Sequence, residues 1–167
     1  MKEIKILSND KQGIYSELLP QCESLIKEER ELVSLLANFT AILKQTFDSF
    51  SWVGFYLIKN GRLILGPFQG KVACSVIEIG KGVCGTSVQK GETIIIEDVD
   101  EFPGHIACDS GSRSEIVIPI FSNNKIFGVL DIDSYKYSNF DSVDKANLEN
   151  LCYILSERIS KLDNSKV

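Results

Sequence analysis

The sequence predicts an α+β fold, in which the middle of the chain forms an antiparallel sheet and helices from the two ends pack on one face. Two observations support this prediction. Near both ends, apolar residues recur at the three- and four-residue spacing of a helix face. In the middle, two turn sequences each separate a pair of strand-like segments. Strands joined by tight turns run antiparallel, so the terminal helices are left to cover the sheet.

The first helical pattern covers residues 16–47, and its apolar positions follow the spacing of one buried face. These positions are Leu32, Leu35, Leu36, Phe39, Ile42, Leu43 and Phe47. Pro20 precedes all of them and has no backbone N–H to donate. We therefore expect Pro20 to lie in a turn or short helix ahead of the main helix.

Six strand-like segments follow, with one short helix among them. The strands are expected at 52–58, 62–68, 76–79, 93–97, 115–121 and 125–133. Lys59-Asn60-Gly61 and Ser122-Asn123-Asn124 are turn sequences, so the first two strands and the last two strands form hairpins. The short helix is expected at 82–89, where Gly91 provides the residue type that commonly ends a helix.

Residues 98–113 form a polar, glycine-containing loop between two of these strands. Loops of this length in a compact domain usually carry function or are disordered. The chain then continues into an amphipathic helix at 141–162. Its buried stripe is expected to comprise Val143, Ala146, Leu148, Leu151, Leu155, Ile159 and Leu162.

Length and composition limit the class of protein. The chain has 167 residues, 44% of them hydrophobic, which suits one domain with a packed core. Its net charge is −5 and no Lys or Arg run exceeds two residues, so no nucleic-acid partner is expected. The sequence has no apolar leader and no stretch near the roughly 20 apolar residues of a membrane span. We therefore expect a cytoplasmic protein that does not contact membranes.

The five cysteines fall into two groups. Cys22 and Cys152 occupy apolar helical patterns, where a buried, inert thiol is the simplest interpretation. Cys74, Cys84 and Cys108 lie in the Gly/Ser-rich middle of the chain, where a packing role explains them less well. An odd number of cysteines in a reducing compartment also argues against a structural disulfide framework. The middle group is therefore predicted to carry chemistry.

A set of acidic residues points to the same region. Asp131 and Asp133 continue the strand face that Phe127 and Val129 occupy, which is otherwise apolar. Glu115 begins the neighbouring strand and joins them if the two strands pair as a hairpin. Clustered carboxylates repel one another, so at least one should hold a proton near neutral pH and can donate a hydrogen bond. The alternative is that all three lie at strand ends and face water.

Two aromatic residues complete the candidate site. Trp52 and Tyr56 lie four residues apart on a predicted strand, so they share a face. Together they can form the wall of a small apolar pocket. A plain core role is the alternative interpretation of this pair.

Two chemistries suit the middle cysteines. A zinc site would use Cys74, Cys84, Cys108 and His105, but their spacings lack the C-x2-C pattern of recognisable zinc sites. In redox chemistry a thiolate attacks, a sulfenic acid forms, and a second thiol resolves it as a disulfide. His105 and Arg113 flank Cys108 and can lower its pKa by charge, unless both are solvated loop residues. We favour redox chemistry and expect neither a metal nor another cofactor.

The sequence resembles the free methionine-(R)-sulfoxide reductases, a stand-alone branch of the GAF-domain family. The segments that carry the resemblance are SWVGFYL (51–57), GPFQGKVAC (66–74), IGKGVCGTS (79–87), VDEFPGHIACDSGSRSEIVIPI (99–120) and GVLDIDS (128–134). The resemblance covers nearly the whole chain, and all three family cysteines are present at the expected spacing. It implies a single GAF domain over residues 1–167, with a central antiparallel sheet of about six strands flanked by N- and C-terminal helices.

The resemblance also implies an activity, the reduction of free methionine-(R)-sulfoxide. Cys108 corresponds to the attacking cysteine of the family, and Cys84 and Cys74 correspond to its partner cysteines. The attacking residue becomes a sulfenic acid as methionine departs, and a second cysteine condenses with it to a disulfide. Attack by Cys84 is the alternative, and our preference for Cys108 rests on its place beside Glu115 and the loop. The implied reductant is thioredoxin.

The other site residues are assigned by the same resemblance. Glu115, Asp131 and Asp133 match the acids that bind the sulfoxide group, and a protonated carboxyl among them would activate its oxygen. Trp52 and Tyr56 match the aromatic residues around the methyl end of the substrate. The expected partners are therefore free methionine-(R)-sulfoxide, thioredoxin and a second copy of the chain in a homodimer.

Two other classes of protein compete with the enzyme. A small-molecule-sensing GAF module would bind a cyclic nucleotide or a similar ligand and pass a signal onward. Such a sensor has no need of three loop cysteines, and we expect no second domain in this chain to receive the signal. A zinc-stabilised binding protein is the third class, and it predicts stoichiometric metal in the purified protein.

Overall fold

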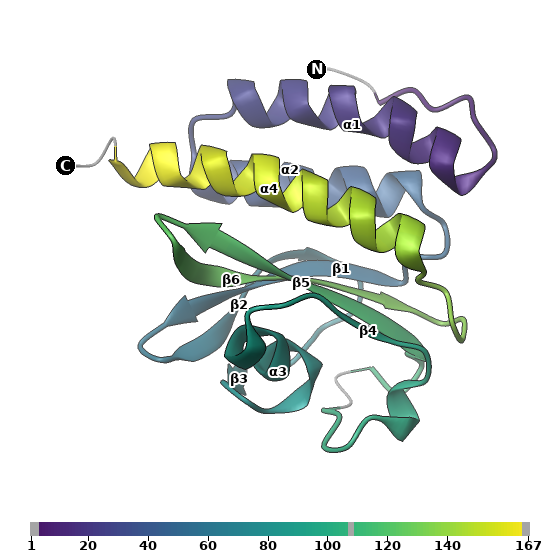
Figure 1. Ribbon diagram of the computed structural model, residues 1–167, viewed down its shortest axis with the longest axis vertical. Coiled ribbons are helices and arrows are strands. Elements are labelled where there is room, and N and C mark those ends of the chain that lie inside the picture. Colours follow the sequence, from purple (N-terminus) through teal and green to yellow (C-terminus); the bar gives the residue numbers. More distant parts are fainter. Residues whose placement is uncertain (1–3, 107–108, 165–167) are drawn as a thin grey trace.

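A computed structural model describes residues 4–106 and 109–164, and its centre is one antiparallel sheet (Figure 1). Six strands form this sheet in the order β3-β2-β1-β6-β5-β4. Their bounds are β1 Trp52–Lys59, β2 Arg62–Gln69, β3 Val76–Glu78, β4 Ile94–Ile96, β5 Ser114–Ser122 and β6 Lys125–Ser134. Every pairing is antiparallel. The prediction of an α+β fold around such a sheet is confirmed.

Both predicted hairpins are present, and their turns contain the residues that allow them. Asn60 and Gly61 join β1 to β2 with φ angles of 53° and 75°. Asn123 and Asn124 join β5 to β6 with φ angles of 50° and 62°. Asparagine and glycine adopt this left-handed backbone more readily than other residues, so these positions direct the chain back on itself.

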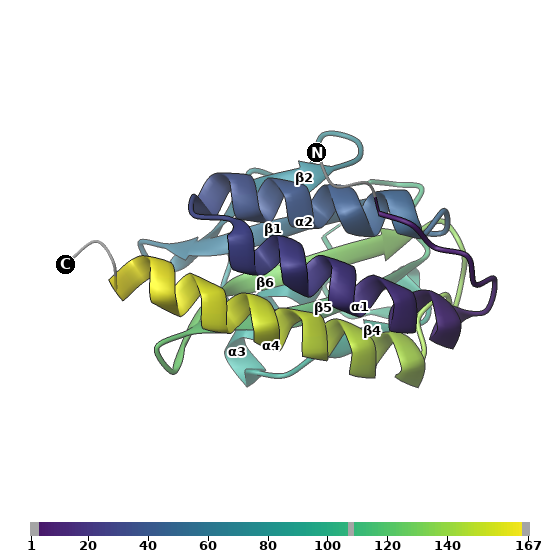
Figure 2. The same cartoon turned by 90° about the horizontal axis from the view of Figure 1, so that it is seen from above.

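Three helices cover one face of the sheet in two tiers (Figures 1 and 2). Helices α2 (Leu32–Thr46) and α4 (Ser142–Asn164) pack directly on the strands, α2 on β1 and β2 and α4 on β5. Helix α1 (Lys11–Glu28) lies on top of these two helices and packs on both of them. The apolar residues that point to this side from the strands and helices form the larger core of the molecule.

Two details of the helices differ from the sequence prediction. Residues 16–47 fall in two helices rather than one main helix. Pro20 lies in a helix ahead of α2, as one of the two alternatives predicted, but this helix, α1, has 18 residues and is not short. Pro20 is exposed there, on the side of α1 away from α4 and α2. In α4 the predicted stripe is buried at Leu148, Leu151, Leu155 and Ile159, but Ala146 is exposed. Asp144, two residues earlier, is buried instead, where it accepts a hydrogen bond from the hydroxyl of Tyr15 in α1.

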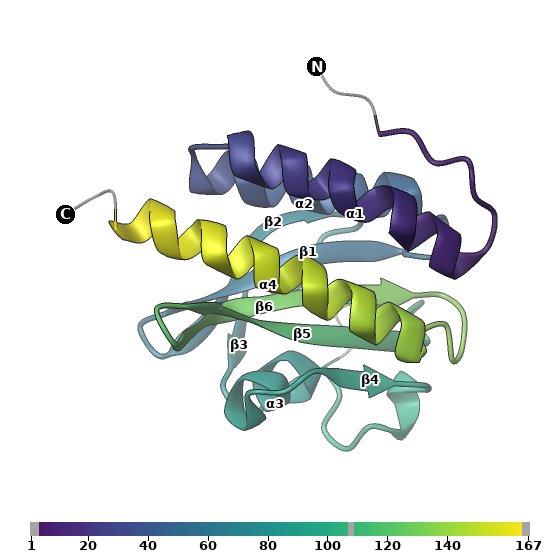
Figure 3. The ribbon, with the colours of Figure 1, turned by 45° about the horizontal axis from the view of Figure 1, so that its top comes forward.

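The opposite face of the sheet is covered by α3 (Gly82–Lys90) and by irregular segments (Figures 1 and 3). Helix α3 ends at Gly91, whose φ of 68° is left-handed, as the sequence predicted for the residue that ends this helix. Loop 98–113 lies on the same side and includes the short 3-10 helix η1 (Val99–Glu101). A second, smaller core lies between α3 and the strands.

Within residues 4–106 and 109–164, no helix has both the length and the apolar composition that crossing a membrane requires.

Candidate active site

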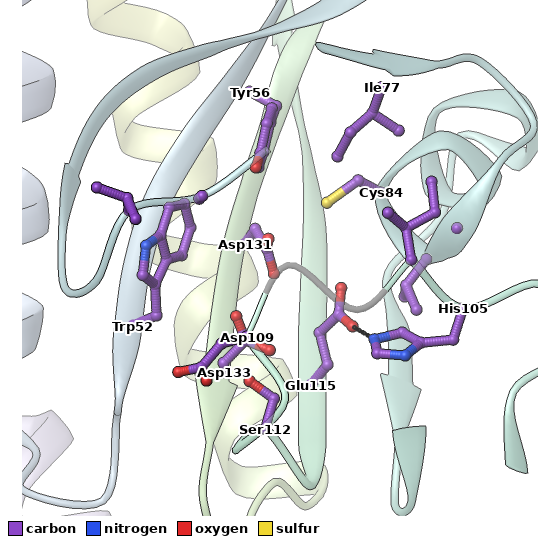
Figure 4. Close-up of a pocket in the computed structure, with 15 residues that line it drawn as sticks. Trp52, Tyr56, Ile77, Cys84, His105, Asp109, Ser112, Glu115, Asp131 and Asp133 are labelled. Atoms are coloured by element: carbon purple, nitrogen blue, oxygen red, sulfur yellow. Dashed lines mark ion pairs between the residues drawn. The ribbon is translucent and has the colours of Figure 1, made fainter. Parts of the chain in front are cut away.

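The pairing of three strands places the predicted site residues in one row. Trp52 on β1 pairs with Asp133 on β6, and Asp133 pairs with Glu115 on β5. One step along the strands, Asp131 of β6 lies between Gly54 of β1 and Val117 of β5. Side chains alternate between the two faces of a sheet, so these residues all point away from the helical layer. A pocket between the sheet, α3 and loop 98–113 is lined by four of these residues, Trp52, Glu115, Asp131 and Asp133 (Figure 4).

One wall of the pocket is aromatic. The rings of Trp52 and Tyr56 stack with their centroids 6.1 Å apart, and both residues are almost fully buried. Trp52 Nε1 donates a hydrogen bond of 3.0 Å to the carbonyl oxygen of Lys71, and the Tyr56 hydroxyl donates one of 2.9 Å to that of Cys74. The two aromatic residues therefore also hold the segment between β2 and β3 against the pocket.

The position of the Trp52 ring depends on a residue without a side chain. A Cβ atom on Gly54 would lie 2.2 Å from the ring of Trp52, closer than such atoms approach one another in proteins. Glycine at this position therefore leaves room for the indole ring of Trp52 to lie against β1, beside the acids of the pocket. A larger residue there would displace the ring and open the wall.

Two of the three acids are buried in this pocket, and Asp133 is half-buried. Glu115 is 5% exposed and Asp131 is 7% exposed, and Asp133 lines the same pocket. Burial raises the pKa of Glu115 and of Asp131 well above their usual range, and the charges of the neighbouring acids raise both further. Burial also raises the pKa of Asp133, to about 6. The alternative that these acids lie at strand ends and face water is therefore wrong.

The described residues that line the pocket include no lysine or arginine to balance these carboxyl groups. The acids must instead hold protons or bind a ligand that carries a donor or a positive charge. A carboxyl that keeps its proton at neutral pH can donate a hydrogen bond to an oxygen of a bound molecule.

Cys84 approaches the acids from the other side of the pocket. It lies in the first turn of α3, is 3% exposed and carries a free thiol. Figure 4 shows its sulfur pointing toward Tyr56 and Asp131. Burial raises the pKa of the Cys84 thiol well above its usual value, and the charges of Asp131 and Glu115 add to this effect. The description of Cys84 as a loop cysteine is therefore wrong, because it is a buried helical thiol.

The other cysteines separate as the sequence predicted where the structure describes them. Cys22 and Cys152 are 0% and 3% exposed in the larger core, and both are free thiols. Cys74 is half-buried on the segment between β2 and β3, and it is disulfide-bonded. The prediction for Cys108 falls outside the described residues.

His105 and Arg113 have different surroundings from those expected. His105 Nε2 lies 3.7 Å from Glu115 Oε2, and the two side chains are 14% and 7% exposed (Figure 4). Burial lowers the pKa of His105, so the imidazole is neutral near pH 7 and supplies no positive charge. Arg113 donates from Nη1 to the carbonyl oxygens of Ser110 and Ser112, and its guanidinium lies over the ring of Tyr137. The description of His105 as a solvated bystander is therefore wrong.

The sequence did not point to two polar residues of the pocket, Asp109 and Ser112, both in loop 98–113. Asp109 accepts a hydrogen bond of 2.8 Å from the Tyr135 hydroxyl and forms an ion pair of 3.2 Å with Lys71. These contacts tie the loop to the segment that carries Cys74. The position of Asp109 directly after Cys108 is the only sequence signal that pointed to it.

The fold and the pocket define the class of protein. The sequence pattern of the GAF domain matches residues 28–160, which include the whole sheet and most of its helical layer. The pocket on one face of this sheet contains a free thiol, two buried acids and a third acid, Asp133, that is half-buried.

Comparison with particular proteins narrows the class. The free methionine-R-sulfoxide reductase of Escherichia coli is 42% identical over 94% of this chain and 95% of its own. The free methionine-R-sulfoxide reductase of Saccharomyces cerevisiae is 44% identical over 89% of this chain and 87% of its own. The structure of the reductase from Neisseria meningitidis in complex with its substrate matches with a TM-score of 0.95 and 44% identity, covering 100% of both chains. The chain belongs to the GAF-domain family of free methionine-R-sulfoxide reductases.

Proposed function

We propose that this protein reduces free L-methionine (R)-S-oxide to L-methionine with cysteine thiols. The observation that carries the proposal is one buried pocket in which the free thiol of Cys84 faces three carboxyl groups beneath an aromatic wall. Membership of the reductase family supports the same substrate. A sensor of small molecules would need no thiol at this position, so the sensing module is the weaker candidate.

The acids serve as the source of the proton that makes the sulfoxide reactive. A sulfoxide sulfur becomes electrophilic only when its oxygen accepts a proton or a strong hydrogen bond. Glu115, Asp131 and Asp133 line the pocket, and burial raises the pKa of each, which favours a protonated carboxyl at neutral pH. In this proposal one of them donates to the sulfoxide oxygen while the others hold the substrate.

The cysteines carry the electrons. The attacking thiolate takes the oxygen from the substrate sulfur, so the sulfoxide is reduced by two electrons and the cysteine becomes a sulfenic acid. A second thiol then displaces water from the sulfenic acid and forms a disulfide. We assign the attack to Cys108. The raised pKa of Cys84 keeps its thiol protonated, which suits a partner that acts second better than the first nucleophile.

Cys74 is the other partner cysteine in this proposal. Its disulfide-bonded state in the structure supports a redox role, and its half-buried position leaves it nearer to solvent than Cys84. The disulfide is returned to two thiols by an external dithiol, for which we propose thioredoxin. Trp52 and Tyr56 form the apolar wall against which the methyl end of the substrate packs.

Three further predictions belong to this proposal. We propose that residues 1–167 form one GAF domain, because α1, α2, α4 and the sheet share a continuous core. We also propose that the protein acts in the cytoplasm, where thioredoxin keeps thiols reduced. A homodimer is the proposed assembly, and sedimentation velocity on the reduced protein would test it.

The activity is tested with the reduced protein, free methionine-(R)-sulfoxide and either thioredoxin with its reductase or dithiothreitol. We expect L-methionine to form with both reductants, and much less to form from the (S) epimer or from an oxidised peptide. Cys22→Ser is the matched control, because Cys22 is buried in the other core. Failure to form methionine with either reductant would overturn the proposed function.

A further inference from the structure

A group of metal-ligand atoms lies at the base of the pocket. Cys84 Sγ, one carboxyl oxygen of Glu115 and one of Asp131 all lie within 4.8 Å of one another. They come from three separate elements, α3, β5 and β6, and all three residues are buried. The zinc ligands considered from the sequence were a different set, which shared Cys84 but contained Cys74, Cys108 and His105 in place of the two acids. The fold brings together a set that the spacing along the chain does not reveal.

One residue of this group has a carboxyl oxygen without the partner that its burial requires. Asp131 is only 7% exposed, and its buried Oδ1 accepts no hydrogen bond. An unpartnered buried carboxyl oxygen is costly, and no lysine or arginine lines the described part of the pocket to compensate for it. Asp131 lines the pocket beside the other two donors, which indicates an external ligand (Figure 4).

The chemistry of the donors identifies the kind of ligand. Calcium and magnesium prefer oxygen donors alone, whereas a thiolate together with carboxylates suits a borderline-soft divalent cation such as Zn²⁺. His105 Nε2 lies 3.7 Å from Glu115 Oε2, so a further nitrogen donor lies beside the group. Tetrahedral zinc sets its ligands roughly 3.5 Å apart, so the group needs to contract by only about 1 Å.

We propose that the reduced protein binds one Zn²⁺ ion through Cys84, Glu115 and Asp131, and that the ion excludes the sulfoxide from the pocket. Coordination displaces the thiol proton and any proton that the two carboxyl groups hold; these protons pass to solvent, and no electron is transferred. The exclusion of substrate rests on the proposed reductase function, whereas the metal site itself does not. Oxidation of Cys84 to a disulfide removes a ligand, so the site exists only in the reduced state.

The site is tested with Co²⁺ as a spectroscopic substitute for Zn²⁺ on protein reduced with a phosphine that contains no thiol. We expect thiolate-to-Co²⁺ charge-transfer absorption with one equivalent of metal, and loss of this absorption when Zn²⁺ is added. Cys84→Ser should abolish it. Cys22→Ser and Cys152→Ser, in the other core, should leave it unchanged. The Kd for Zn²⁺, measured against a coloured chelator, should rise at least about tenfold in Asp131→Asn and Glu115→Gln.

The possible results separate the two proposals. Charge-transfer absorption that persists in Cys84→Ser, or no absorption at all, overturns the metal site even if the protein turns over sulfoxide. Absorption that depends on Cys84 in a protein without turnover supports the metal site and overturns the reductase function. With turnover present, Zn²⁺ should raise the apparent KM for sulfoxide, and a chelator should reverse this effect.

Discussion

Carboxyl groups are buried on both sides of the sheet, but only on the helical side do all of the buried oxygens compared have hydrogen-bond partners. On the helical face, Asp144 is 1% exposed and both of its oxygens have partners. The hydroxyl of Tyr15 donates to Oδ1 at 2.9 Å, and the backbone N–H of Asp141 and the ammonium of Lys11 donate to Oδ2. On the pocket face, Asp131 is similarly buried and its Oδ1 has no partner. A satisfied buried acid holds the fold together, whereas an unsatisfied one marks a place for a ligand.

The cysteines follow the same division. Cys22 and Cys152 lie among apolar side chains, and burial raises the pKa of both thiols, that of Cys22 to about 12. Thiols in such surroundings are poor nucleophiles. Cys84 is equally buried but faces carboxyl groups in a pocket, and Cys74 lies nearer to the surface. Burial alone therefore does not distinguish an inert thiol from a functional one. The distinction comes from the side chains around the thiol, which are apolar for Cys22 and Cys152 and include carboxyl groups for Cys84.

The largest expected effect tests this division of the cysteines. Cys108→Ser should reduce methionine formation to the level of the assay without protein, because serine cannot form a sulfenic acid. Cys22→Ser and Cys152→Ser should retain nearly full activity. Mass spectrometry of the oxidised protein should find disulfides only among Cys74, Cys84 and Cys108. A Cys22–Cys152 disulfide that forms during turnover would contradict the division.

The acids of the pocket are expected to give the next largest effect. Glu115→Gln, Asp131→Asn and Asp133→Asn keep the size of each side chain but alter its proton and its charge. Each should lower kcat/KM by about 10²- to 10⁴-fold, the usual contribution of a general acid, while circular dichroism stays unchanged. The effects should be strongly non-additive in a double variant, since the three groups share one pocket. Near-full activity in all three variants would mean that the proton comes from elsewhere.

Asp144 provides the matched experiment on the helical face. Asp144→Ala removes the acceptor for Tyr15 and Lys11 and leaves the Tyr15 hydroxyl buried without a partner. We expect a loss of about 2–4 kcal/mol in the free energy of unfolding, reduced from a fully buried pair because Lys11 is 34% exposed. Urea denaturation measures this loss, and kcat/KM of the folded protein should not change. A large drop in kcat/KM at unchanged stability would contradict a structural role.

The contrast between the faces also explains what the sequence could predict. Alternation of side chains and the two turn sequences were sufficient to place Asp131, Asp133 and Glu115 on one face, because strand register follows from the hairpins. Asp144 could not be predicted to be buried. Its partner Tyr15 lies 129 residues away in the sequence, and only the packing of α1 on α4 brings the two together.

The residues of the loops were the hardest to predict. His105 faces Glu115 because residues 105–106 of the loop line the pocket, and an irregular segment carries no periodicity from which to derive its side-chain directions. The burial of Cys84 depends on α3 packing against the sheet, and a nine-residue helix in the sequence does not reveal which side it will bury. Contacts between distant segments determined both outcomes.

The smallest expected effect concerns stability and pH, and it comes from Asp133. Burial raises the pKa of its carboxyl from the usual value of 3.8 to about 6 in the folded protein. A raised pKa means that the folded state binds the proton more tightly than the unfolded state. The resulting stabilisation is complete below pH 3.8 and is lost as the pH rises through about 6. The free energy of unfolding should therefore increase between pH 8 and pH 5, by on the order of 1–3 kcal/mol.

Asp133→Asn tests this assignment, because asparagine cannot ionise. Urea denaturation of the variant should show a smaller dependence on pH between 5 and 8 than the unchanged protein shows, and higher stability at pH 8. Glu115 and Asp131, whose pKa values burial also raises, give a pH dependence of the same sign, so only the difference between the variant and the unchanged protein is assigned to Asp133. Asp109 and Asp141 have lowered pKa values and titrate below this window. The ionised acid of the pocket would thus lower the free energy of unfolding at neutral pH, whereas Asp144 on the helical face raises it. Equal pH dependence in the variant and the unchanged protein would show that Asp133 does not hold its proton in the folded state.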